Sequence, residues 1–197
     1  MQLSDIRTRV RYILKEPTAS VWSNDEIDAE INLAQRYVAS NVAPKYLPEL
    51  IKQDSDTGAT NTYAYDLDTD YLQMAADDVV EISVSGTANR IFKIVTPDQA
   101  LLDYSFQTNH ALDGRLVCYI ANNDINFIDV PTVGASLTWL FVKKPDDLSG
   151  DTDESEINDG LIHIVIDVAA ANCLKKTNIQ KASELMDYAS KSIKALQ

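Results

Sequence analysis

Four aspartates between residues 66 and 77 come nearest to the spacing of a metal site. They occupy positions 1, 3, 5 and 12 of a calcium-binding loop: Asp66, Asp68, Asp70 and Asp77. Position 6, where such a loop needs glycine, is Tyr71, and position 12 is an aspartate in place of the usual bidentate glutamate. We interpret the stretch as a solvated acidic turn, and a calcium- or carbohydrate-binding module remains an alternative function.

The two histidines offer no complete metal or catalytic set. His163 and Asp167 lie one helical turn apart and could place two ligands on one face, but a catalytic zinc site takes about three protein ligands. The apolar neighbours of His163 favour a histidine of the core or of an interface. His110 follows "FQTN" in a predicted loop, where the sequence identifies no partner for it.

The sequence carries no motif of the common enzyme classes. It has no G-x-S-x-G elbow, and its six glycines lie too far apart for a dinucleotide fingerprint or a P-loop. Carboxylates are so numerous that spacing alone singles out no catalytic pair. We therefore predict no catalytic residues, no cofactor and no enzymatic activity.

Cysteine content and hydropathy indicate a cytoplasmic protein with no membrane span. Cys118 and Cys173 stand in apolar surroundings that predict buried free thiols, although a disulfide stays open as an alternative. No apolar run approaches the length of a transmembrane helix. The N-terminal stretch carries charges too closely spaced for a signal peptide.

The net charge of −13 is distributed unevenly along the chain. Residues 1–52 carry seven basic and seven acidic side chains, residues 53–160 five and twenty, and residues 161–197 five and three. The acidic middle repels a phosphate backbone, so we do not expect sequence-specific nucleic-acid binding through it.

The N-terminal part predicts two amphipathic helices. The first runs from about Ser4, as N-cap, to Leu14. The second lies in "VWSNDEIDAEINLAQRYVA", where Ser23 and Glu26 have the spacing of a capping box and Trp22 and Ile27 that of a hydrophobic staple. "PELIKQ" then predicts a last helical turn.

The middle of the chain predicts strands. "TYAYDL" alternates, "VVEISVS" and "RIFKIV" form a hairpin, and "TPDQALLDY" is a short helix capped by Thr96. "RLVCYIA", "INFIDV" and "SLTWLFVKK", separated by short turns, predict an antiparallel meander.

The C-terminal part returns to helices after an acidic loop. "LIHIVIDVAAANCLKK" predicts a helix buried on most sides, and a last helix begins at about Asn178. The predicted fold is α+β, a helical bundle formed by the N- and C-terminal helices with an inserted antiparallel β-rich region. Its parts are a helical 1–52, a β-rich insertion 53–150, and C-terminal helices 151–197 that pack on 1–52 as one structural unit.

With these elements placed, the chain resembles the head-to-tail adaptor (connector) proteins of tailed bacteriophages. That family opens with an "R-x-R-V-x-x-x-L" helix, matched by "LSDIRTRVRYIL", and continues with "W-S-D-x-E-I-x-x-x-I-N-x-A-Q". The second pattern falls on Trp22, Ser23, Asp25, Glu26, Ile27, Ile31, Asn32, Ala34 and Gln35. The strand "LTWLFVKKP" and the acidic loop after it continue the likeness, which departs at Asn158, where such chains often carry proline.

The resemblance implies a structural virion protein of the neck, assembled in the host cytoplasm. It implies a twelve-fold homo-oligomeric ring beneath the portal protein, connected below to a tail or nozzle protein, with DNA passing through without sequence-specific binding. A head-completion or tail-terminator protein is the alternative role. The basic residues of the helical ends are the candidates for ring or portal contacts: Arg7, Arg9, Arg11, Arg36, Lys175, Lys176, Lys181, Lys191 and Lys194.

Overall fold

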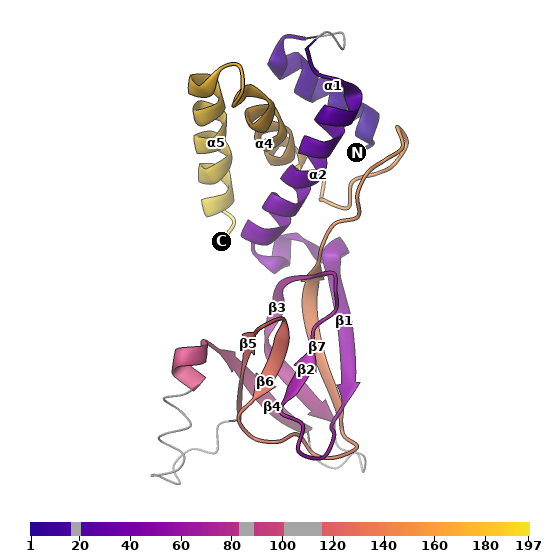
Figure 1. Ribbon diagram of the computed structural model, residues 1–197, viewed down its shortest axis with the longest axis vertical. Coiled ribbons are helices and arrows are strands. Elements are labelled where there is room, and N and C mark those ends of the chain that lie inside the picture. Colours follow the sequence, from indigo (N-terminus) through magenta and orange to yellow (C-terminus); the bar gives the residue numbers. More distant parts are fainter. Residues whose placement is uncertain (17–20, 83–88, 101–115) are drawn as a thin grey trace. The chain divides into compact units, whose positions relative to one another are not determined.

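The computed structural model describes residues 1–16, 21–82, 89–100 and 116–197 (Figure 1). The chain divides into two compact units. The helical unit comprises residues 1–50 and 142–197, and the sheet unit comprises residues 51–141. Residues 97–100 of the short helix expected after Thr96 are helical, whereas its residues 101–104 and His110 lie outside the described residues.

The helical unit is built around one apolar helix, α4 (Ile162–Leu174). Helices α1 (Leu3–Leu14), α2 (Asn24–Asn41) and α5 (Ile179–Lys194) all pack against α4, which Figure 1 shows between α5 and the other two. Ten of the thirteen residues of α4 are buried, as its nearly continuous apolar sequence predicts. Two 3₁₀ turns, η1 (Pro44–Tyr46) and η2 (Pro48–Leu50), follow α2.

Local capping explains where α2 and α5 begin. The Ser23 hydroxyl accepts from the Glu26 N–H at 3.2 Å, and the Glu26 carboxylate accepts from the Ser23 N–H at 3.0 Å, which completes the capping box. The Asn178 side chain accepts from the Lys181 N–H at 3.1 Å and begins α5. The N-cap expected at Ser4 is wrong.

The start of α1 is set by contacts distant in sequence instead. The N-cap is Gln2, which has no side-chain capping bond and pairs as an isolated bridge with Glu154. The next N–H, that of Leu3, donates to the Asp153 carbonyl at 2.9 Å, and the Leu3 side chain is fully buried. The chain around 153–154 therefore holds the helix start two residues before the point that Ser4 suggests.

The sheet unit holds a seven-stranded, nearly closed, barrel-like sheet. Its strands are β1 (Ile51–Thr57), β2 (Ala64–Asp66), β3 (Tyr71–Ile82), β4 (Asn89–Val95), β5 (Val117–Ala121), β6 (Asp124–Phe127) and β7 (Ser136–Lys143). Their order in the sheet is β1-β7-β3-β4-β5-β6-β2. Its buried cluster is rich in aromatic side chains, with Phe92 and Phe127 packed edge to face at 4.7 Å between ring centroids.

The strand pairing is antiparallel for β3–β4, β5–β6 and β2–β6, but parallel for β4–β5. Asn122 and Asn123 join β5 to β6 with φ values of 56° and 68°. Two successive residues in the left-handed region are the signature of a tight type I′ hairpin turn, which Asn tolerates well.

The predicted fold class, a helical bundle with an inserted antiparallel β-rich region, is therefore wrong. The structure is mixed α+β, and its large sheet contains a parallel pair, β4–β5. The predicted meander also fails, because β6 pairs with β2 while β7 lies between β1 and β3. The turn after β6 marks a reversal of the chain, but turn residues do not specify which strand the chain pairs with next.

A buried carboxylate on β3 holds the turn at Thr132 by hydrogen bonds. Glu81 is 1% exposed and accepts from the N–H and the hydroxyl of Thr132, both at 2.8 Å, with the Arg90 guanidinium 3.3 Å away. Gly58 lies against the same turn, and a Cβ atom at this position would overlap the carbonyl oxygen of Thr132. This close backbone approach requires glycine.

Candidate functional site

Arg7, a predicted contact residue, is bound inside the helical unit. Its Nε and Nη2 donate to the two carboxylate oxygens of Asp28 on α2, each at 2.7 Å, and its Nη1 donates to Asp151 at 2.8 Å. Its side chain is only 12% exposed, and the hydrogen bonds with Asp28 raise its pKa further above the ordinary arginine value. Arg7 therefore joins α1 to α2 and is not available to a neighbour.

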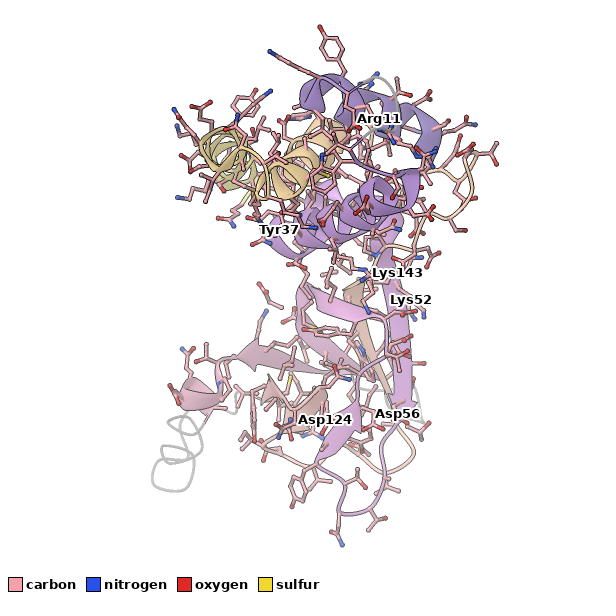
Figure 2. All side chains as sticks on the ribbon, turned by 45° about the horizontal axis from the view of Figure 1, so that its top comes forward. Arg11, Tyr37, Lys52, Asp56, Asp124 and Lys143 are labelled. Carbon is pink, nitrogen blue, oxygen red and sulfur yellow. The ribbon has the colours of Figure 1, made fainter. Side chains whose placement is uncertain are left out.

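Arg11 is likewise committed to the connection between α1 and α2 (Figure 2). It is 8% exposed, and its Nη2 donates to the Trp22 carbonyl at 3.0 Å and to the Asn24 side chain at 2.8 Å. Glu16, also buried, accepts from the backbone N–H groups of Val21 and Trp22. The opposite charges of Arg11 and Glu16, 3.8 Å apart, offset part of the cost of burying each one.

Other predicted contact residues are partly engaged. Arg36 forms an ion pair with Asp147, Lys175 donates to the Asn172 side chain at 2.7 Å, and the Lys176 ammonium lies 5.4 Å from the centre of the Trp22 ring.

The remaining predicted residues differ in exposure. Lys181 donates to the Ile13 carbonyl at 2.9 Å. Arg9, Lys191 and Lys194 are exposed, and none forms an ion pair with a residue that the structure describes. These three of the nine predicted residues are therefore the most accessible to a partner protein.

A groove runs along the exposed side of α1. It consists of two adjoining cavities of about 680 Å³ and about 440 Å³ that share Thr8, Tyr12 and Ile13. We call these two cavities the α1 groove. The other described residues that line it are Arg9, Arg11, Lys15, Glu16, His163, Ile166, Asp167 and Lys181. Tyr12, on α1, is 85% exposed.

The rim of the α1 groove is basic. Arg9 on α1 and Lys15 just after its end are exposed, and Lys181 reaches the groove from α5. Glu16 is neutralised by Arg11, which leaves Asp167 as the other carboxylate among the described lining residues. Burial raises the pKa of Asp167, an effect that the charge of His163 partly opposes.

The pair suggested as metal ligands thus lines this groove. His163 is exposed and not part of the core, although its neighbours on both sides are buried. Within the described ranges, no group of three or more His, Cys, Asp or Glu side chains is placed to hold a metal ion. The sequence did not single out Tyr12 or Lys15, because each acquires its setting from α4 and α5.

The aspartates with calcium-loop spacing lie in the sheet unit and have partners of their own. Asp68 accepts from the Asp70 N–H at 3.0 Å and from the Lys52 ammonium at 2.6 Å, and these two bonds, in that order, lower its pKa. Asp66 belongs to β2 and Asp77 to β3. This geometry is an acidic turn held by hydrogen bonds, and it gives the calcium- or carbohydrate-binding alternative no support.

Acidic side chains dominate the sheet unit. Residues 51–141 carry thirteen acidic against four basic side chains, a net charge of −9. The exposed carboxylates among its described residues are Asp56, Asp66, Asp70, Asp77 and Asp98. Figure 2 shows Asp56 and Asp124 on this unit together with Lys52, one of its few cations.

Comparison with known families gives a match that spans both units. The model of the family described as SU10 adaptor protein matches residues 1–196. No curated protein matches the chain. Because the family match covers nearly every residue, the chain belongs to the SU10 adaptor protein family, a family of phage head-to-tail adaptors.

Proposed function

We propose that this member of the SU10 adaptor protein family forms a ring beneath the portal, connects the capsid to the tail and conducts DNA. The observation that carries the proposal is the family match over residues 1–196, which includes the helical unit and the sheet unit alike. Such a protein acts through contacts between surfaces, so the proposal includes no catalytic step, no cofactor and no resident metal ion.

The charge of the sheet unit supports the conduction of DNA. A net charge of −9 on residues 51–141 repels the phosphate backbone. A channel that attracted DNA would hold it, since every phosphate contact adds affinity. We place acidic side chains of the sheet unit along the bore, where DNA slides past without binding.

The proposed assembly is a twelve-fold ring in the neck of the virion, built in the host cytoplasm. Its upper partner is the portal protein, and its lower partner is a tail or nozzle protein. Each copy of a head-to-tail ring needs two different, complementary faces. Of the predicted contact residues, we keep Arg9, Lys191 and Lys194 as candidates, because they are exposed and form no ion pair with a described residue. In the described part of the chain, no helix is long and apolar enough to cross a bilayer.

The test is assembly with purified components. The protein is mixed with portal rings from the same phage and followed by sedimentation velocity and negative-stain microscopy. The expected result is a ring attached to one end of the portal. The proposal is contradicted if the protein does not bind portal at any concentration. Binding to tail tubes and not to portal identifies a head-completion or tail-terminator role instead.

The DNA-conduction step has its own measurement. Assembled rings are titrated with a short DNA duplex at low salt, where electrostatic binding is strongest. The expected result is no measurable affinity. An affinity that falls steeply as salt rises would show a basic, DNA-holding bore and would contradict this part of the proposal.

A further inference from the structure

We propose that the α1 groove of one copy receives the outer face of α5 from the next copy, which makes this pair of surfaces the contact between neighbours in the ring. The inference rests on the proposed function, because it assigns residues to the ring contact. It goes further by naming both surfaces and the charges that match them.

The first surface is apolar at its centre and basic at its rim. Tyr12, 85% exposed, stands between the two cavities of the α1 groove, and the part-buried Ile13 lies beside it. Arg9 and Lys15 flank this aromatic centre and are exposed. Neither forms an ion pair with any residue in the described ranges.

The second surface is the outward side of the first three turns of α5. Ile179 is 77% exposed and Tyr188 is 59% exposed, although both are large apolar or aromatic side chains. Glu184 and Asp187 lie between them in the sequence and are exposed as well. Residues 180, 184, 187, 188 and 191 recur at helical spacing on the side opposite the buried Ala182 and Ala189, so they form one face. We call the exposed residues Glu184, Asp187 and Tyr188 the α5 face. Lys191 lies on the same side one turn further along the helix, whereas Ile179, at the helix start, points to a different side.

The two surfaces are complementary and different from each other. Each presents exposed apolar area, which gains free energy when it is covered. Arg9 and Lys15 on the groove are opposite in sign to Glu184 and Asp187, and two α1 grooves would bring like charges together. Contacts between unlike surfaces propagate around a ring, whereas a self-complementary surface ends at a dimer. A second copy of the chain is therefore the occupant that these charges select.

The experiment reverses the charges on each surface separately. The groove variant carries Arg9→Glu and Lys15→Glu, and the face variant carries Glu184→Lys and Asp187→Lys. In either variant alone, every neighbour contact brings like charges together, so self-association should weaken at least about tenfold. Sedimentation velocity and native mass spectrometry measure the assembly, and circular dichroism checks that each variant is folded.

Mixing the two variants provides the decisive result. In an equimolar mixture, the reversed groove meets the reversed face and the unchanged groove meets the unchanged face. Rings should then reappear with equal numbers of the two variants, a composition that native mass spectrometry resolves by mass. A Lys45→Glu variant, which changes an exposed lysine of the same unit outside both surfaces, should assemble as the wild type does.

The outcomes separate this inference from the proposed function. Rings formed by both charge-reversed variants alone overturn the interface and leave the adaptor role in place. A mixture that stays dissociated also overturns it, because matched charges are then insufficient. If the variants form rings but fail to bind portal, the α1 groove or the α5 face receives the portal and not a second copy. A wild-type protein that binds portal while remaining a monomer at every concentration likewise refutes the inference.

Discussion

The contact between Arg7 and Asp28 should make one of the largest single electrostatic contributions to the stability of the helical unit. Two hydrogen bonds of 2.7 Å join the guanidinium to both carboxylate oxygens, and the two side chains are only 12% and 15% exposed. This is the bidentate geometry in which arginine binds carboxylates most strongly. Changing Asp28 to alanine leaves the buried guanidinium with one carboxylate, Asp151, which is itself 72% exposed.

The magnitude follows from burial. Breaking a fully buried ion pair costs about 3–5 kcal/mol, whereas an exposed pair contributes about 0–1 kcal/mol. Side chains about seven-eighths buried lie nearer to the first limit, but Asp151 still accepts one bond from the guanidinium. We therefore expect Asp28→Ala to lower the free energy of unfolding of the helical unit by about 2–3 kcal/mol.

The two tryptophans permit an assay specific to the helical unit. Trp22 belongs to the helical unit and Trp139 to the sheet unit, and both are buried. In a Trp139→Phe background, fluorescence during urea unfolding therefore reports on the helical unit. A double-mutant cycle with Arg7→Ala, Asp28→Ala and both together then isolates the pair, with an expected coupling of about 2 kcal/mol.

The matched control is the ion pair of Arg36 and Asp147 in the same unit. Its side chains are 34% and 59% exposed, so the same cycle should give a coupling below about 1 kcal/mol. The reasoning is refuted if the two cycles give equal couplings, because burial would then not decide the strength of these pairs.

Four further measurements test other parts of the structure. Ser23→Ala removes the cap of α2 and should cost the helical unit about 1 kcal/mol in urea unfolding, and an unchanged midpoint would contradict the capping role. Gly58→Ala places a methyl group against the facing backbone and should destabilise the sheet unit by about 2 kcal/mol or more, measured through Trp139 fluorescence. Hydrogen bonds from two backbone N–H groups lower the folded-state pKa of Asp153 below the reference value of 3.8. The ionised carboxylate therefore stabilises the folded protein fully above pH 3.8, and this contribution is lost as the pH falls through the folded-state pKa. Asp153→Asn should therefore flatten the decline of stability with acid, and parallel curves for the two proteins would argue against this. Burial raises the pKa of the Cys118 thiol to about 12 and that of Cys173 to about 11, so both should resist a thiol reagent in the folded protein and react after unfolding in urea.

Local patterns in the sequence predicted the helical parts well. The capping box of α2 depends on two residues three positions apart, and the apolar sequence of α4 requires burial whatever surrounds it. The hairpin of β5 and β6 likewise depends on two adjacent asparagines that accept left-handed conformations. Each of these features is decided by residues within one or two turns of one another.

The sheet could not be predicted in the same way. β1 was missed because its sequence, "IKQDSDT", is polar and six of its seven residues are exposed, which leaves little alternating pattern to detect. The parallel pairing of β4 with β5, and the separation of β6 from β7, join segments whose partners no turn specifies. The predicted fold class, a helical bundle with an inserted antiparallel β-rich region, is wrong for this reason. Alternation of apolar and polar residues identifies strands, but it does not identify which strands pair in the sheet.

The sequence by itself determined which side chains are charged, where α2 begins, and how acidic the middle of the chain is. Only the tertiary structure decided that Arg7 and Arg11 form hydrogen bonds inside the helical unit. Arg9, on the same helix, is exposed and can contact a partner. The physical reason is that a charge is neutralised by whatever lies within a few ångströms of it. For Arg7 and Arg11 those neighbours come from α2 and the chain leading into it, which residue spacing along α1 cannot specify.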